Sequence, residues 1–281
     1  MLLSTHDLTK EFGGITAVDG VDFTLEEGEL CSVIGPNGAG KTTLFNLLTG
    51  VLEPTAGSIE FAPSDFEGDR RDDSVDITAA SPHETALLGL HRSYQITNIF
   101  PTVSVRENVR IAVQAHRGRD SWKFWRNVGA FDEHVAETER ILQRIGLAAA
   151  ADRAAETLSH GEKRTLEIGI ALAGDPDLLL LDEPTAGVSS EDVSQVTAII
   201  EDIAADHAVM LIEHNMDVVM GISDRVAVLN QGELIAQDDP ESVRESEAVQ
   251  RAYLGGYDPG GADAGSETNA DDGGEPGVSA G

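Results

Sequence analysis

The stretch GPNGAGKTTLFNLLTG, from Gly35 to Gly50, decides the fold. It contains the spacing G-x-x-x-x-G-K-T, with Gly40, Lys41 and Thr42 closing the pattern directly after the apolar run ELCSVI. Between a strand and a helix, this spacing is typical of a loop that wraps nucleotide phosphates. The glycines let backbone N–H groups approach phosphate oxygens, the lysine reaches the β- and γ-phosphates, and the threonine hydroxyl suits Mg²⁺. A glycine turn that only caps a helix would leave the Lys-Thr pair without a purpose.

Patterns on both sides of this loop predict an α/β fold. Leu44, Leu47 and Leu48 have helical spacing, and Gly50 is placed to end that helix. The alternating runs GITAVDGVDFTLEEGE and GSIEF predict a small antiparallel layer. Farther along, the apolar runs DLLLLD and AVMLIEH alternate with helical patterns, which predicts a largely parallel sheet core. Residues 230–232, in RVAVLNQGELIAQ, predict a hairpin turn.

Three segments depart from this pattern. Helical periodicity predicts a helical subdomain over about residues 96–165. In it, Trp122 and Trp125 lie three apart, which favours packing in the core over a partner-docking face. The Asp-rich text at about residues 62–82 is expected to be a solvated insertion. Residues 257–281 have too few apolar side chains to offset the ordering entropy and are expected to form a disordered acidic tail.

Charge and composition exclude several classes of function. The chain has 50 acidic and 19 basic residues and a formal net charge of −31, which opposes binding to nucleic acid or to anionic lipid. We interpret this balance as adaptation to concentrated salt, with an ordinary acidic protein as the alternative. The single cysteine, Cys31, lies in an apolar run and is expected to be a buried hydrophobe. No signal-peptide pattern or apolar run of membrane-spanning length is apparent, so a soluble intracellular chain is expected.

Acidic and imidazole side chains follow two of the predicted parallel strands. Asp182 and Glu183 end the run LLLLDEP, where Asp182 suits the Mg²⁺ shell and Glu183 suits polarising a water beside the γ-phosphate. His214 ends the run AVMLIEH and suits holding the γ-phosphate and orienting Glu183. Gln95, in HRSYQ, is a weaker candidate for the Mg²⁺ shell. The plain alternatives are an acidic turn and a structural histidine.

The stretch LSHGEKR, from Leu158 to Arg164, resembles a second phosphate-binding element. Ser159 and Glu162 fit a capping box, so a well-capped helix start is the plain interpretation. The same helix start, with Gly161, also offers free N–H groups and a positive dipole end to an anion. Because one nucleotide cannot fill both elements of one chain, we expect this one to act on ATP held by a second subunit.

The order GPNGAGKTT, YQ, LSHGEKR, LLLLDEP, EH resembles that of the nucleotide-binding subunit of ABC transporters over about residues 1–256. The resemblance implies a P-loop ATPase core with antiparallel and helical subdomains. It also implies that two subunits, identical or different, clamp ATP and Mg²⁺ and hydrolyse ATP. Phe12 matches the aromatic that stacks on adenine. The residues implied to contact nucleotide are Phe12, Gly35, Pro36, Asn37, Gly38, Ala39, Gly40, Lys41, Thr42, Thr43, Ser159, Gly161 and Glu162.

Finer wording, including ITNIFPTVSVRENV, LIEHNMDVVMGISDRVAVLNQGELIA and RAYLGG, resembles the ATP-binding subunit of branched-chain amino acid importers. This implies permease partners, an indirect link to a solute-binding protein, and a location on the inner face of the cell membrane. Urea and amide importers share this wording, and a soluble assembly ATPase without a permease remains an alternative. Ser189 stands where the family usually carries Asn or Asp, which puts cross-subunit coupling in doubt. In the stretch LSHGEKR, His160 and Glu162 are variants of the residues that the family more usually carries.

Overall fold

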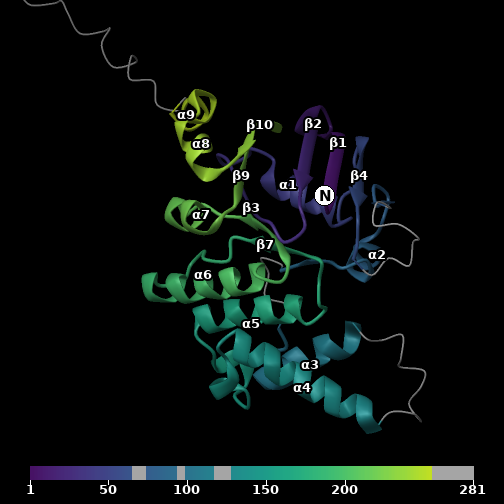
Figure 1. Cartoon of the computed structure of the whole chain (residues 1–281), viewed down its shortest axis with the longest axis vertical. Coiled ribbons are helices and arrows are strands. Elements are labelled where there is room, and N and C mark those ends of the chain that lie inside the picture. The colour runs from purple at the N-terminus through teal and green to yellow at the C-terminus, as the bar shows by residue number, and fades with distance from the viewer. Residues whose placement is uncertain (65–73, 94–98, 117–127, 255–281) are drawn as a thin grey trace, which may run out of the picture.

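The computed structural model describes residues 1–64, 74–93, 99–116 and 128–254. Gln95, Trp122, Trp125 and the tail from residue 257 lie outside the described residues. The described chain contains two β-sheets with helices between and around them (Figure 1). Within these ranges, no helix has both the length and the apolar character that a membrane span requires.

The larger sheet is mostly parallel, as the alternating apolar runs predicted. Its strand order is β10-β9-β3-β8-β7-β6, and only the β9–β10 hairpin is antiparallel. The parallel strands therefore end at one common edge, where the predicted site residues follow β3, β7 and β8. The strands are β3 (Leu30–Ile34), β6 (Leu90–Arg92), β7 (Leu178–Asp182), β8 (Ala208–Ile212), β9 (Arg225–Asn230) and β10 (Glu233–Asp238).

The smaller sheet is antiparallel and has the order β2-β1-β4-β5, which confirms the predicted antiparallel layer. Apolar side chains of its inner face, such as Phe23 and Phe61, join the core beneath it. This sheet gives the phosphate loop a second wall, because β2 passes beside the loop. The strands are β1 (Leu3–Phe12), β2 (Ile15–Leu25), β4 (Ala56–Phe61) and β5 (Val75–Asp76).

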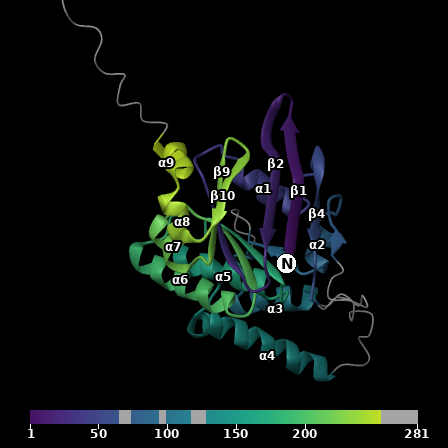
Figure 2. The same cartoon turned by 45° about the horizontal axis from the view of Figure 1, so that its top comes forward.

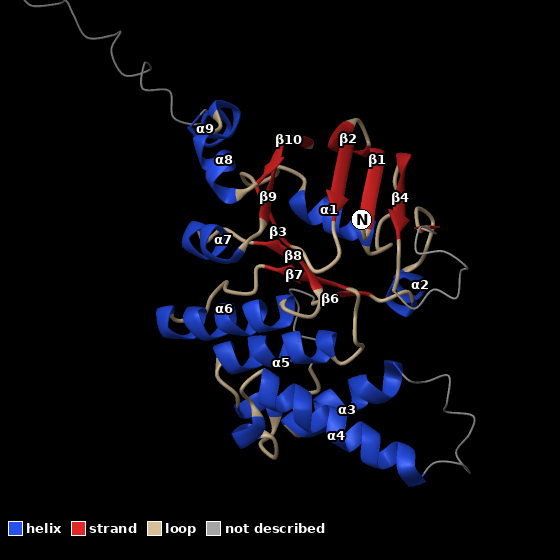
Figure 3. Ribbon diagram, in the orientation of Figure 1, coloured by secondary structure: helices blue, strands red, loops and turns tan. Residues whose placement is uncertain are grey.

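Side-chain alternation along β7 explains why the parallel sheet is covered on both faces. Leu178 and Leu180 belong to the core shared with α1 and the antiparallel sheet, whereas Leu179 and Leu181 belong to the core shared with α5 and α6. Figure 3 shows α1 between the two sheets and α5 and α6 across the parallel sheet from it. The helices that flank the parallel sheet are α1 (Lys41–Leu48), α5 (His160–Leu172), α6 (Ser190–Ala204) and α7 (Met216–Ile222).

Of the remaining helices, α2 lies beside the antiparallel sheet and the others lie at the two ends of the molecule (Figure 1). Figures 1 and 2 show α3 and α4 at the end opposite α8 and α9. In α3 the buried Val105, Val109 and Val113 recur every four residues and pack in the same core as Ile141 of α4. The helices are α2 (Pro82–Leu87), α3 (Val105–His116), α4 (Val128–Arg144), α8 (Pro240–Glu245) and α9 (Glu247–Leu254), with 3₁₀ turns at Ala148–Ala150 and Ala155–Thr157.

The prediction of a solvated insertion over residues 62–82 is wrong on its C-terminal side. β5 pairs with β4, with Val75 opposite Phe61, and Ile77 is 2% exposed within the core. Ser81 then caps α2. Among the described residues of this Asp-rich segment, Ile77 is buried beside an edge strand, and Val75 and Ala80 are partly buried against the same core. Residues 65–73 of this segment lie outside the described part.

Cys31 lies on β3 and is fully buried, as its apolar surroundings predicted. Burial is the main cause that raises the pKa of its thiol to about 12, with a smaller contribution from the Glu29 carboxylate. The thiol therefore stays protonated at neutral pH and behaves as a small apolar side chain.

Candidate functional site

The phosphate loop joins the end of β3 to α1 and needs glycine at two close approaches. Gly35 and Gly40 have φ of 152° and 101°. A Cβ on Gly35 would collide with the carbonyl oxygen of Leu229 on β9, and a Cβ on Gly40 would collide with that of Ala17 on β2. The loop is thus held between the two sheets, and only glycine allows both approaches.

Lys41 begins α1 and folds back over the loop. Its Nζ donates to the carbonyl oxygens of Gly35, at 2.7 Å, and Pro36, at 3.1 Å. Burial lowers the pKa of Lys41, while the nearby carboxylates of Glu183 and Asp182 act in the opposite direction. Asp182 and Glu183, which act on this ammonium, are the two acidic residues predicted for the site.

Asp182 ends β7 and is bonded to a residue that sequence reasoning missed. Its Oδ2 accepts a hydrogen bond from Arg92 at 2.7 Å, and both side chains are buried. Arg92 ends β6 and also donates to Oδ1 of Asn46 on α1, at 2.6 Å. No sequence spacing links these residues, so only the parallel pairing of β6 with β7 reveals the contact.

Glu183 and His214 meet at the common edge of the parallel sheet. His214 Nε2 lies 3.0 Å from Oε1 of Glu183, which is consistent with the predicted pairing of a carboxylate with an orienting imidazole. Glu183 has φ of 50°, in the left-handed region that a non-glycine residue enters at a cost. The strained residue is therefore the one whose carboxylate contacts His214.

Two further buried charges organise the loop after β7, and neither was predicted. Glu213 accepts from the backbone N–H and the hydroxyl of Thr185 and from the N–H of His214. Arg164, on α5, donates to the carbonyl oxygens of Asp182 and Pro184. The LSHGEKR helix is therefore bonded directly to the backbone that carries Asp182 and Glu183.

The start of α5 has the predicted capping box. Ser159 Oγ accepts from the N–H of Glu162 at 3.1 Å, and the Glu162 carboxylate accepts from the N–H of Ser159 at 2.7 Å. Glu162 also pairs with Arg153. Gly161 lies against Asp192 of α6, where a Cβ would collide with the carboxylate. Ser159 itself remains exposed.

Ser189 caps the N-terminus of α6. Its Oγ accepts from the N–H of Asp192 at 3.2 Å and donates to the Asp192 carboxylate at 2.8 Å. The serine that replaces the family's usual Asn or Asp is thus an N-cap, a role that all of these residue types perform.

Phe12, at the end of β1, is 46% exposed. Lys10 Nζ lies 5.3 Å from the centre of its ring and donates to the carbonyl oxygen of Glu53 at 2.5 Å. An exposed ring with a fixed cation at one side is compatible with the predicted stacking on a base.

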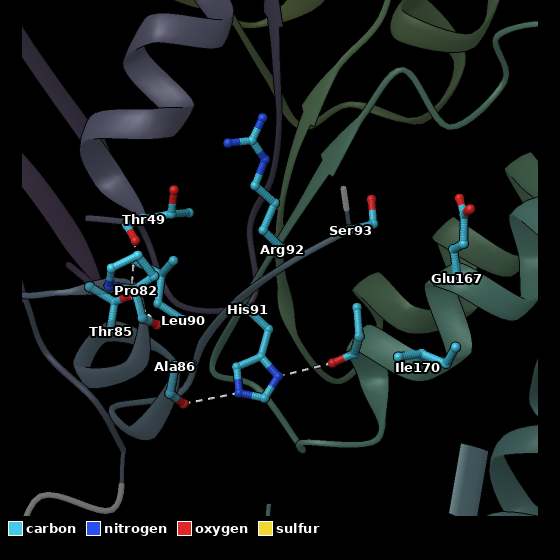
Figure 4. A pocket seen from close by; sticks show the side chains of 11 residues that line it. Thr49, Pro82, Thr85, Ala86, Leu90, His91, Arg92, Ser93, Glu167 and Ile170 are labelled. Carbon is cyan, nitrogen blue, oxygen red and sulfur yellow. Dashed lines mark hydrogen bonds between the residues drawn. The ribbon is translucent and has the colours of Figure 1, made fainter. Parts of the chain in front are cut away.

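A cavity of about 270 Å³ opens beside the site, between α2, β6 and α5. Figure 4 shows His91 on its floor, with both ring nitrogens bonded to backbone carbonyl oxygens, those of Ala86 and Ala171, each at 3.0 Å. A Cβ on Gly174 would collide with this ring, so the histidine is packed as well as bonded. Arg92 of β6 and Glu167 of α5 are among the residues that line this cavity.

Comparison with known proteins identifies a family whose matched region contains most of these site residues. The family model for ABC transporters matches residues 18–186, which span the phosphate loop, LSHGEKR and the acidic end of β7. The chain belongs to the ABC transporter family. A model of the branched-chain amino acid ATP-binding cassette transporter matches residues 233–259.

Relatives of this ABC ATPase cover nearly its whole described length. It is 37% identical to the high-affinity branched-chain amino acid transport ATP-binding protein LivG of Escherichia coli (strain K12), over 90% of this chain and 98% of the relative. The corresponding BraF of Pseudomonas aeruginosa is 36% identical with the same coverage. A nucleotide-free ATP-binding cassette from an ABC transporter superposes with a TM-score of 0.74 at 27% identity, covering 90% of this chain and 98% of that one. The ADP conformation of another such cassette gives 0.74 at 28% identity, with the same coverage.

The family and the fold establish the activity class. The chain is an ATP-binding subunit that hydrolyses ATP to drive transport.

Proposed function

We propose that this ABC ATPase powers the import of branched-chain amino acids. The observation that carries the proposal is its likeness to LivG and BraF along their whole length, together with the match of residues 233–259 to the branched-chain cassette model. Permease subunits would complete the transporter and hold the chain at the inner face of the membrane. A solute-binding protein would deliver the amino acid to them.

The site geometry supports a division of roles during hydrolysis. Lys41 and the backbone N–H groups of residues 37–43 would hold the β- and γ-phosphates, because the loop lies at the N-terminus of α1. Glu183 would accept a proton from the attacking water, and His214, 3.0 Å from it, would fix its direction and donate to the γ-phosphate. Phe12 would stack on adenine.

The oxygen atoms at the site fit Mg²⁺. Thr42 supplies a hydroxyl and Asp182 a carboxylate, the hard oxygen ligands that this ion prefers. Gln95 is a third candidate. Within the described ranges, no cluster of three or more His, Cys, Asp or Glu could hold a metal ion. The bound ion would neutralise phosphate charge.

The capped start of α5 supports action on a second subunit. Ser159 is exposed and its helix end faces away from the core, so the positive end of α5 is available to a phosphate. Two chains, identical or different, would each contribute a phosphate loop and an LSHGEKR helix start to one ATP.

Ser159→Arg is expected to abolish ATP-driven dimerisation and to leave ATP affinity of the monomer unchanged, because the long cation fills the space that the partner's phosphate would enter. Sedimentation with ATP, in a Glu183→Gln background, measures the amounts of monomer and of dimer. Ser81→Arg is the matched control, because Ser81 caps α2 through the same capping box with Glu84. Loss of monomer affinity in Ser159→Arg alone would contradict action in trans.

The acidic surface supports a salt-rich environment. With a net charge of −31, like charges repel in the folded state, and the Debye length falls from about 10 Å at 0.1 M salt to about 3 Å at 1 M. The thermal unfolding midpoint is expected to rise between about 0.1 M and about 1 M KCl, as circular dichroism can follow. A midpoint that falls over this range would contradict the proposal.

Uptake of labelled leucine tests the transported solute. Cells lacking this chain are expected to lose the uptake, and wild type but not Lys41→Ala is expected to restore it, with isoleucine and valine as competitors. Unchanged leucine uptake with lost urea or amide uptake would show that urea or an amide, and not a branched-chain amino acid, is the transported solute. Unchanged uptake of all three would favour an assembly ATPase without a permease.

A further inference from the structure

Two neighbouring residues of β6 extend in opposite directions. Figure 4 shows His91 directed between α2 and α5, and Arg92 directed away from it. Arg92 therefore crosses to the face of the sheet edge where α1 and Asp182 lie. Its side chain is 5% exposed and that of Asp182 is 3% exposed, so water does not screen the pair.

The Arg92 guanidinium contacts two elements of the site at once. One terminal nitrogen donates to Asn46 at 2.6 Å and the other to Asp182 at 2.7 Å. The guanidinium carbon also lies 5.5 Å from the centre of the Phe45 ring. The planar fork of arginine makes both hydrogen bonds in fixed directions, which a lysine ammonium does not.

Asn46 lies one helical turn beyond Thr42 on α1. Thr42 and Asp182 are the two described residues proposed for the Mg²⁺ shell, and they come from different elements, α1 and β7. A single buried side chain thus connects the helix that carries one ligand with the carboxylate that is the other.

Stability alone is a weak explanation for this arrangement. A buried ion pair pays a desolvation cost that its mutual attraction often does no more than offset. The ion pair has a clearer effect on geometry, because the outer partners of a metal ligand fix the direction in which that ligand presents its oxygen.

We propose that Arg92 is a positioning residue that fixes the Asp182 carboxylate relative to α1 and thereby sets the affinity of the site for Mg²⁺. It acts through Asp182 and Asn46 and touches no substrate. The inference rests on the proposed place of Asp182 in the Mg²⁺ shell.

Binding of ADP at a series of Mg²⁺ concentrations tests this role without turnover. In Arg92→Gln, the Mg²⁺ concentration for half-maximal enhancement of ADP binding is expected to rise about 10-fold or more, the usual effect of removing an outer partner. ADP affinity without Mg²⁺ is expected to stay within about twofold. Arg92→Lys keeps the charge without the fork and is expected to recover only part of the effect.

Two further variants separate positioning from folding. Asn46→Ala cuts only the bond to α1 and is expected to raise the Mg²⁺ requirement by a smaller factor. Arg225→Gln is the matched control, because Arg225 begins β9, which β3, β8 and β7 separate from β6, and pairs there with Glu29. It is expected to lower the unfolding midpoint and to leave the Mg²⁺ requirement unchanged.

The outcomes separate the inference from its premise. If Asp182→Asn raises the Mg²⁺ requirement and Arg92→Gln does not, the positioning role is overturned and the role of Asp182 stands. If Asp182→Asn has no effect, the proposed metal role fails and the inference fails with it. Tighter Mg²⁺ binding in Arg92→Gln would identify Arg92 as a competing cation and would also overturn positioning.

Discussion

Replacing Glu183 by Gln is expected to lower ATP turnover by about 10²- to 10⁴-fold while ATP binding is retained, because a neutral amide cannot accept the proton of the attacking water. Gln has the same shape and meets the same backbone strain at φ of 50°, so the loop is expected to stay in place. The hydrogen bond to His214 can also persist through the amide oxygen. Steady-state phosphate release measures turnover, and sedimentation with ATP is expected to show an accumulated nucleotide-bound dimer.

The matched control for this variant is Glu201→Gln, which makes the same chemical change at an exposed position of α6. It is expected to hydrolyse ATP at the wild-type rate. Normal turnover in Glu183→Gln would exclude Glu183 as the proton acceptor and would leave His214 as the next residue to test.

Local pattern was enough to predict the framework. The G-x-x-x-x-G-K-T spacing and the apolar runs at 178–181 and 208–212 predicted the loop, its strand and the parallel core, because phosphate-loop geometry and strand burial both leave a short-range pattern in sequence. The capping box at Ser159 was equally local and is present in the structure.

Long-range contacts account for what sequence reasoning missed. Arg92 meets Asp182 across 90 residues, and Arg164 meets the Asp182 carbonyl across 18 residues with no characteristic spacing. Ile77 was assigned to a solvated insertion because its neighbours are acidic, although one apolar side chain at a sheet edge can be buried regardless of its neighbours. Such contacts depend on how the chain folds, so a motif does not reveal them.

Lys41→Ala is expected to weaken ADP binding to the monomer by about 10- to 100-fold, because charge-assisted hydrogen bonds to phosphate contribute about 1.5–3 kcal/mol. In the structure, Nζ is bonded to the loop's own carbonyl oxygens of Gly35 and Pro36, within reach of the phosphate-binding backbone. Nucleotide would exchange these carbonyl partners for phosphate oxygens. The variant therefore removes an attraction to the ligand and also the hydrogen bonds from Lys41 to the loop backbone.

Titration calorimetry with ADP separates those two effects when the unfolding midpoint is measured alongside it. Lys163→Ala, on α5, removes the same charge away from the phosphate loop and is expected to leave monomer affinity unchanged. If Lys41→Ala binds ADP as tightly as wild type, phosphate recognition would fall to the backbone N–H groups alone. ADP affinity and the unfolding midpoint can also fall together in Lys41→Ala, with Lys41→Arg restoring only the midpoint. In that case the hydrogen bonds from residue 41 to the loop backbone account for stability, and the position of the ammonium accounts for binding. The bulkier guanidinium cannot occupy the place of Nζ.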